Sequence, residues 1–304
     1  INKFYFYNTP NLTTITIPKS DYSKYLNLKG ILYTKDKTKI IVAERNIKSA
    51  TISSKCQVIS NFAFNIPSLE KVTFESNSEL KEISHFAFSS SQVKKITLPD
   101  TVKKLSEGSF YKCVKLDSIN VPNSIRSIEY ATFSYTNLST ITIPKNVKKI
   151  GHGSFYRCQK LSKISFEEGS KLTEIETLAF AETNIASILI PKSVKIIGDF
   201  CFINCSKLKS IKFEENSKLN RIGKECFRGT IITDIKLPTT VEYCHFSNTK
   251  VKTVSFDGGC GSLLRVSNFQ FSQITEFCIP SSATHIGKCA FLECGNLSVV
   301  KVAD

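Results

Sequence analysis

One apolar pattern recurs along almost the whole chain, and it constrains the fold more than any other feature of the sequence. A phenylalanine returns every 19 to 25 residues in the same context, and the fullest copy, residues 109–133, reads SFYKCVKLDSINVPNSIRSIEYATF. A unit this short cannot bury an apolar face alone, but a stack of such units can. The recurring residues are Phe64, Phe88, Phe110, Phe133, Phe155, Phe180, Phe202, Phe227, Phe246, Phe271 and Phe291.

Each unit contains an alternating L-x-x-I-x-I segment, which predicts a strand with one face buried. A turn, a V-x-x-I segment and a short helical turn are expected to follow before the phenylalanine. Length differences between units fall in the turns, as a stacked coil tolerates. We therefore predict an α/β repeat in one domain over residues 1–304, with a parallel β-sheet face and short helical turns. The thirteen expected strand units begin at Leu12, Ile47, Leu69, Val93, Leu116, Leu138, Leu161, Ile185, Leu208, Ile232, Val251, Ile274 and Leu297.

Residues 19–46 interrupt the repeat. Within them, GILYTKDKTKIIVAE has two β-type runs on either side of Lys35-Asp36-Lys37-Thr38. This arrangement predicts a hairpin inserted into the array at about residues 30–43.

The full repeat, F-x-x-C-x-x-L-x-x-I-x-h-P-x-x-V-x-x-I-x-x-x-A-F, where h is apolar, resembles the BspA-like leucine-rich repeats over about nine tenths of the chain. The resemblance implies a right-handed leucine-rich-repeat solenoid. It also implies a cell-surface or secreted adhesin or antigen that binds host or microbial proteins. In four units an acidic or glycine-rich link replaces the proline turn, after Phe74, Phe166, Phe213 and Phe256.

The segment contains no run of 18 apolar residues, so no membrane span is expected within it. Four N-glycosylation sequons, at Asn11, Asn137, Asn204 and Asn296, agree with secretion. Neither end carries the polar cap that solenoids need, and we therefore expect a fragment of a longer array.

The formal net charge of +15 favours acidic partners, and two surfaces could receive them. Hydroxyl and lysine side chains occupy the outward positions of the expected strands, and a basic stripe follows the proline turns. These surfaces are predicted to contact proteins of a host cell surface or matrix. The candidate residues are Lys71, Lys95, Thr142, Lys163, Lys212 and Lys236 on the strands, and Lys103, Lys104, Arg126, Lys148, Lys149 and Lys195 in the stripe.

Two alternatives to protein binding stay open. The basic stripe could bind a sulfated glycan, and the solenoid could be a structural spacer that displays another domain. Nucleic acid is disfavoured as a partner, because nearly all phenylalanines fall in core positions and leave no interleaved aromatics for base stacking.

No motif for catalysis, cofactor binding or metal binding is present, and a non-enzymatic protein is predicted. The eleven cysteines are an odd number, and six of them occupy small-residue positions of the repeat, which indicates buried structural thiols. A disulfide or a reactive thiol is expected, if anywhere, among the less regular Cys244, Cys260, Cys278 and Cys289.

Overall fold

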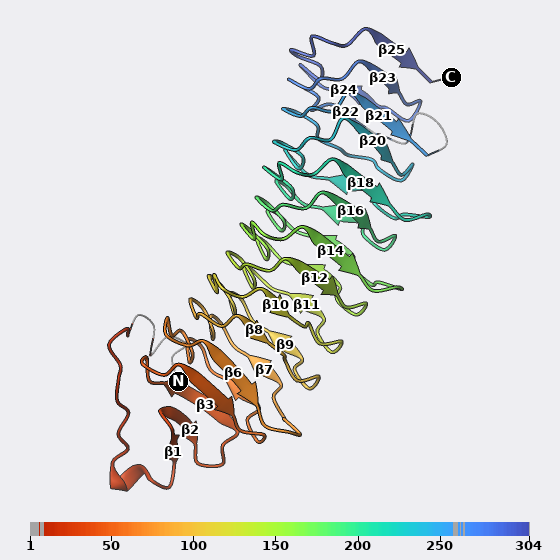
Figure 1. Ribbon diagram of the computed structural model, residues 1–304. Coiled ribbons are helices and arrows are strands. Elements are labelled where there is room, and N and C mark those ends of the chain that lie inside the picture. Colours follow the sequence, from red (N-terminus) through yellow and green to blue (C-terminus); the bar gives the residue numbers. More distant parts are fainter. Residues whose placement is uncertain (1–5, 7–8, 258–260, 262, 264, 304) are drawn as a thin grey trace.

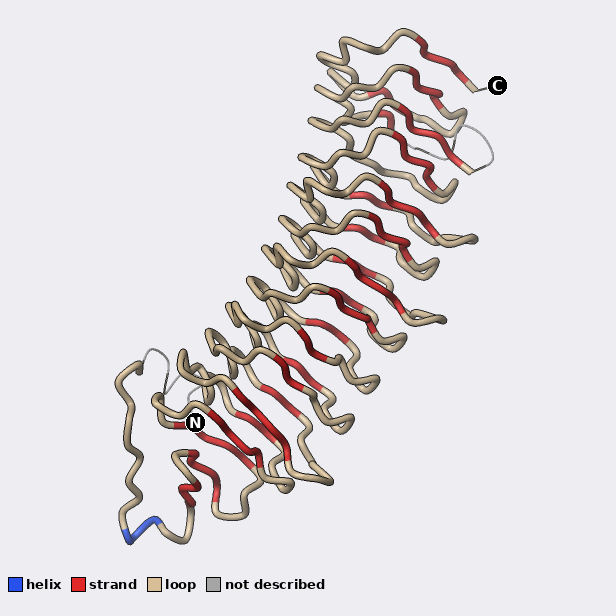
Figure 2. Tube along the Cα trace, in the orientation of Figure 1, coloured by secondary structure: helices blue, strands red, loops and turns tan. Residues whose placement is uncertain are grey.

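The computed structural model describes residues 6, 9–257, 261, 263 and 265–303, which form one elongated stack of coils (Figure 1). Each coil runs from a strand on one face, through a turn, to a shorter strand on the opposite face, and returns through a second turn. Figure 2 shows the two rows of strands along the stack. This parallel β-solenoid is the predicted architecture.

The L-x-x-I-x-I segments form the first row of strands, which we call the front row. Side chains alternate between exposed and buried along these strands, as in Thr140–Ile143 and Ser187–Ile190. The front row comprises β4 (Ser49–Ile52), β6 (Lys71–Phe74), β8 (Lys95–Ile96), β10 (Ser118–Ile119), β12 (Thr140–Ile143), β14 (Lys163–Phe166), β16 (Ser187–Ile190), β18 (Ser210–Phe213), β20 (Asp234–Leu237), β21 (Thr253–Phe256), β23 (Glu276–Ile279) and β25 (Val299–Val302).

The V-x-x-I segments form a second row of two-residue strands, the back row, which the sequence did not lead us to expect as strands. They too pair in parallel, with one buried isoleucine, leucine or valine in most coils. The back row comprises β5 (Val58–Ile59), β7 (Glu82–Ile83), β9 (Lys104–Leu105), β11 (Ser127–Ile128), β13 (Lys149–Ile150), β15 (Glu174–Ile175), β17 (Ile196–Ile197), β19 (Arg221–Ile222), β22 (Arg265–Val266) and β24 (His285–Ile286).

The N-terminal part packs on the first coil. β2 (Ile31–Thr34) pairs antiparallel with β1 (Tyr25–Leu28) and with β3 (Lys39–Ala43), and β3 continues in parallel into β5. Residues 12–17, the first of the thirteen expected strand units, form no strand. They form a largely exposed segment beside β1, where Asn27 Nδ2 donates a hydrogen bond to the Ile15 carbonyl at 2.8 Å.

Arg45 joins this N-terminal part to the stack and is 6% exposed. Its guanidinium donates hydrogen bonds to the carbonyls of Phe62 and Ala63 at 3.2 and 3.3 Å and to that of Phe6 at 3.1 Å. It also lies 3.4 Å from the carbonyl of Thr9. The buried cation therefore satisfies main-chain oxygens at the end of the stack.

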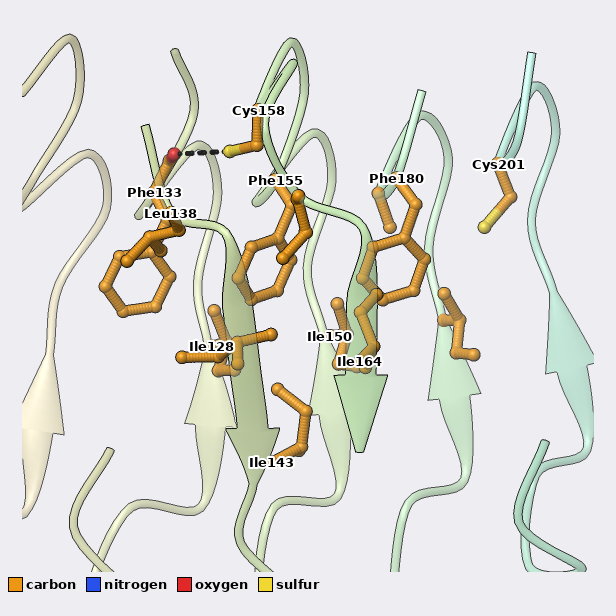
Figure 3. Packing of buried hydrophobic residues seen from close by; sticks show 14 of the residues in the cluster. Ile128, Phe133, Leu138, Ile143, Ile150, Phe155, Cys158, Ile164, Phe180 and Cys201 are labelled. Carbon is orange, nitrogen blue, oxygen red and sulfur yellow. Dashed lines mark hydrogen bonds between the residues drawn. The ribbon is translucent and has the colours of Figure 1, made fainter. Parts of the chain in front are cut away.

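One continuous core fills the space between the two rows. The repeated phenylalanines form a column of stacked rings whose centroids lie 5.2 to 6.0 Å apart from Phe64 to Phe291. Figure 3 shows Phe133, Phe155 and Phe180 in this column, above the isoleucines of the strands.

The column corrects one position of the repeat. Phe269 is fully buried against Phe246 and Phe291, whereas Phe271 is 53% exposed. The assignment of Phe271 to the core was therefore wrong. With Phe269 in its place the intervals on either side are 23 and 22 residues, in line with the other coils.

The expected short helical turns are also absent, and the described residues contain one 3-10 turn, Lys19–Asp21. In most coils the residues two before and two after the core phenylalanine have positive φ, as at Ala131 and Tyr135 around Phe133. A helix cannot pass through such residues. The N–H groups of these residues and of the phenylalanine between them instead bond to carbonyls of the next coil, from Ala131 to His152, from Phe133 to Ser154 and from Tyr135 to Tyr156, at 2.8 to 3.0 Å.

These bonds make a third ladder along the stack, at the turns that contain the phenylalanines. We call this side the turn edge. Backbone groups that a helix would satisfy within itself are satisfied here between coils, which ties each coil to its neighbour on a third side.

Candidate functional site

The outward side chains of the front row form a surface that we call the strand face. It carries six of the predicted contact residues, and all six are exposed: Lys71, Lys95, Thr142, Lys163, Lys212 and Lys236. Each lysine lies opposite a neutral partner in its strand pair, such as Ser49 opposite Lys71 and Thr140 opposite Lys163. Within these strand pairs no two lysines are directly opposed, and Lys236 Nζ is ion-paired with Asp257 Oδ1 at 2.6 Å.

The other six predicted residues lie on the opposite side of the solenoid, at the start of the back strands. Lys103, Arg126, Lys148 and Lys195 are exposed there. The structure therefore divides the candidates between two faces, and a flat partner cannot contact both faces at once.

Acidic coils neutralise part of the basic stripe. Lys104 Nζ lies 3.2 Å from Glu82 Oε1 in the preceding coil, and Lys149 Nζ lies 2.5 Å from Glu176 Oε1 in the next coil. The hydrogen bond to Glu176 raises the pKa of Lys149. These two lysines are less available to a partner than Lys103, Arg126 and Lys148.

The repeat cysteines are structural thiols, as predicted. Cys113, Cys158, Cys205 and Cys294 are buried, and each Sγ donates to the carbonyl of a core phenylalanine one coil earlier at 2.9 to 3.1 Å. Figure 3 shows the bond from Cys158 to Phe133. Burial raises the pKa of Cys113 to about 12 and that of Cys158 to about 11, which keeps these thiols protonated and unreactive at neutral pH.

The four irregular cysteines differ from one another. Cys244 is buried and Cys289 is exposed, and both are free. Cys278 is disulfide-bonded, and Cys260 lies outside the described residues.

A depression of about 700 Å³ lies on the back of the stack, where the coil between Val241 and Phe246 is three residues shorter than the others. Asp199, Lys224, Glu242, Cys244 and His245 line it. Burial raises the pKa of Cys244 to about 12 and lowers the pKa of His245. The thiol is therefore a poor nucleophile at neutral pH.

Neither a metal centre nor a membrane span emerges from the described residues. They contain no group of three or more histidine, cysteine, aspartate or glutamate side chains placed to hold a metal ion. No helix among them is long and apolar enough to cross a membrane.

The sequence reasoning missed a row of aromatic and cationic side chains at the turn edge. Rings follow one another from Phe86 through Tyr111 and Tyr135 to Tyr156, with centroids 5.9, 5.7 and 5.5 Å apart and nearly perpendicular planes. We call these four residues, together with Lys112 and Arg157, the tyrosine–cation strip. Its signal in the sequence was the recurrence of tyrosine and basic residues one and two positions after the core phenylalanine in successive units.

Each cation of the strip lies over two tyrosine rings. Lys112 Nζ is 5.2 Å from the ring centroid of Tyr111 and 5.8 Å from that of Tyr135. The Arg157 guanidinium is 5.6 Å from the ring of Tyr135 and 5.2 Å from that of Tyr156. Glu182 accepts hydrogen bonds from Arg157 and from the Tyr156 hydroxyl at the end of the strip, and raises the pKa of Arg157.

Comparison with protein families identifies the repeat. The model described as BspA type leucine rich repeat region matches in six copies, over residues 41–158, 127–251 and 218–304. The chain belongs to the BspA-type leucine-rich repeat family. Repeats of this family are in general non-enzymatic scaffolds. A search of characterised protein sequences gave no match.

Solved structures agree with the fold. A leucine-rich repeat protein from Bacteroides ovatus is similar at 20% identity and a TM-score of 0.56, over 96% of this chain and 83% of that one. The pneumococcal vaccine antigen PcpA is similar at 19% identity and a TM-score of 0.52, over 93% of this chain and 82% of that one. At these identities the likeness concerns the leucine-rich-repeat solenoid alone.

Proposed function

We propose that this chain is a non-enzymatic protein-binding module, displayed at a cell surface or secreted, that acts as an adhesin or antigen. Its strand face would contact proteins of a host cell surface or matrix. The observation that carries the proposal is the row of exposed threonine, serine and lysine side chains on the parallel strand pairs of the front row, without directly opposed like charges in the pairs that carry lysine. Membership of the BspA-type leucine-rich-repeat family and a likeness in fold to a bacterial antigen support it.

Binding through such a face would combine many weak polar contacts. Exposed lysines and hydroxyls supply little energy singly, because each stays solvated in the free protein. Several copies on one surface would convert weak contacts into strong attachment by raising the effective concentration.

The test is a binding panel of immobilised fibronectin, laminin, collagen and fibrinogen, measured by surface plasmon resonance. The variant Lys71→Thr/Lys163→Thr/Lys212→Thr alters the strand face with a residue that the same positions hold in other coils. We expect its affinity for the bound partner to fall about tenfold. If all four proteins fail to bind at micromolar concentration, the protein-binding proposal is wrong and the spacer alternative is favoured.

A second candidate, binding of a sulfated glycan, is favoured by the exposure of Lys103, Arg126 and Lys148 in successive coils of the back face. Heparin serves as the probe. Glycan binding at the back face would be established by two results. Retention on heparin should fall steeply with salt. The variant Lys103→Ser/Arg126→Ser/Lys148→Ser should abolish retention, whereas the strand-face variant should not.

A further inference from the structure

We propose that the tyrosine–cation strip is a docking site for an acidic segment of a partner protein. The strip lies at the turn edge, away from the strand face to which the proposed function assigns binding. It is defined by Phe86, Tyr111, Lys112, Tyr135, Tyr156 and Arg157.

The repeat itself does not require large side chains here. One position after the core phenylalanine, other coils have Ser89, Ala181 and Ser247, whereas the strip has Tyr111 and Tyr156. The coils that lack tyrosine make the same turn-edge hydrogen bonds, such as Asn248 to Gln270 at 2.9 Å. The aromatic rings are therefore additions to the fold and are not needed to close the coil.

The strip also places bulky side chains on backbone that disfavours them. Lys112, Tyr135 and Arg157 have φ of 56°, 60° and 58°, in the left-handed region. Asparagine and glycine adopt that region most easily, and Asn204, Gly229 and Asn248 hold the corresponding place in three later coils. In three successive coils, Lys112, Tyr135 and Arg157 occupy this disfavoured backbone conformation and place their side chains at the surface.

The composition is that of an interaction hot spot. Tyrosine and arginine are the residues most enriched where interfaces gain their binding energy. The rings are held by one another and by the cations, so little side-chain freedom remains to be lost when a partner binds. Exposed Val114 and Tyr130, 47% and 49% accessible, lie in the same coils.

Charge identifies the partner as acidic. Lys112 and Arg157 are exposed, as are Lys115 and Lys160 a few residues after each. Among the described residues no carboxylate lies within ion-pair distance of Lys112, and Glu182 pairs with Arg157 at the far end. Glu182 thus takes up part of the charge of Arg157, and the exposed cations that a partner's carboxylates can reach from solvent are Lys112, Lys115 and Lys160.

Ring geometry favours a polypeptide over a sugar chain. A sugar stacks flat on an open aromatic face, but Lys112 and Arg157 already lie over the faces of Tyr111, Tyr135 and Tyr156. In each perpendicular contact between neighbouring tyrosines, with planes 83° and 87° apart, the edge of one ring also covers a face of the other. The Lys112 ammonium and the guanidinium nitrogens of Arg157 that Glu182 does not bind are left for the partner, and they match the carboxylates of an acidic peptide.

The experiment uses the whole chain as bait for a displayed library of random 12-residue peptides, followed by titration of the enriched peptides. We expect the enriched peptides to be rich in aspartate and glutamate. The strip variant Tyr111→Ser/Lys112→Asn/Tyr135→Asn/Tyr156→Ser/Arg157→Asn carries residues that the same positions hold in other coils, so its fold is retained and is checked by circular dichroism. Its affinity for the peptides should fall at least about tenfold.

The control is Lys163→Thr/Lys212→Thr on the strand face. It removes two positive charges, as many as the strip variant does, and should leave peptide affinity within about twofold. Failure to enrich any peptide, or equal binding by the strip variant, overturns the inference. If the control variant loses as much peptide affinity as the strip variant, the binding reflects net charge alone, and the inference is also overturned. Binding of heparin oligosaccharides alone at the strip would identify a glycan site and refute the peptide assignment. These outcomes leave the matrix-protein panel, which tests the strand face, unaffected.

Discussion

Truncation of Phe269 and of Phe271 to alanine should have very different consequences, although the two residues are two positions apart. Phe269 is fully buried, with ring centroids 5.8 Å from Phe246, 5.3 Å from Phe291 and 4.8 Å from Phe277. Removing a buried ring costs its transfer free energy plus the cavity that it leaves, about 3–5 kcal/mol in total. Phe271 is 53% exposed, and its removal leaves no enclosed cavity, so the cost should stay below about 1 kcal/mol.

Urea unfolding followed by circular dichroism measures the two costs, with local stability reported by hydrogen exchange of peptides within residues 265–291. Exchange is needed because coils contact only their neighbours, and a repeat array can unfold in parts. Phe271→Asn is the matched control, since asparagine adopts the positive φ of 58° at this position more easily than phenylalanine does. If Phe271→Ala destabilises the protein as much as Phe269→Ala, the assignment of Phe269 to the core column and of Phe271 to the surface is wrong.

Four further experiments test other parts of the stack. Arg45→Ala should lower the free energy of unfolding by about 2–4 kcal/mol, because buried carbonyls lose a charged hydrogen-bond donor. It should also speed amide hydrogen exchange in residues 9–63. Unchanged exchange would show that the N-terminal part does not depend on this side chain. In the native protein at pH 8, iodoacetamide should label Cys289 and spare Cys113, Cys158 and Cys244, as peptide mass spectrometry would show. Since these buried thiols have pKa values raised to about 11–12 and ionise near 8.5 when unfolded, their contribution to stability should be complete below pH 8.5 and be lost as pH rises toward 12; stability that is constant across that range would contradict the argument. Gly198→Ala should destabilise by about 2 kcal/mol or more, since its new β-carbon would lie 2.5 Å from the Thr177 nitrogen, whereas Gly295→Ala meets nothing within 4 Å and should be close to neutral in thermal unfolding.

Much of the fold could be predicted from periodicity. Residues such as Leu138, Ile141 and Ile143 recur with spacing that only a stacked coil explains, and all three are buried in and around β12. The V-x-x-I segments were harder, because two residues per strand carry too short an alternation to indicate a strand on their own. Their pairing is visible only when neighbouring coils are in place.

The candidate residues were placed less well than the core. Outward positions follow from strand alternation, so the exposure of Lys71 and Lys163 could be anticipated. The separation of Lys103 and Lys148 from them onto an opposite face, and the pairing of Lys149 with Glu176, depend on how the coil closes. The tyrosine–cation strip was missed because its rings come from different coils, and local spacing does not reveal contacts between coils.

The sequence by itself determined the repeat, the stacked strands, the burial of the repeat cysteines and the family. Those properties follow from which residues are apolar and how often they return, and burial of apolar surface is set by that pattern. Only the tertiary structure decided that the turns around the core phenylalanines contain residues with positive φ and are not helical. It also decided that Phe269 and not Phe271 enters the core, and which charges lie together. The physical reason is that these features rest on hydrogen bonds and ring contacts between residues more than 20 positions apart, such as Tyr135 with Tyr156, which form only when one coil lies on the next.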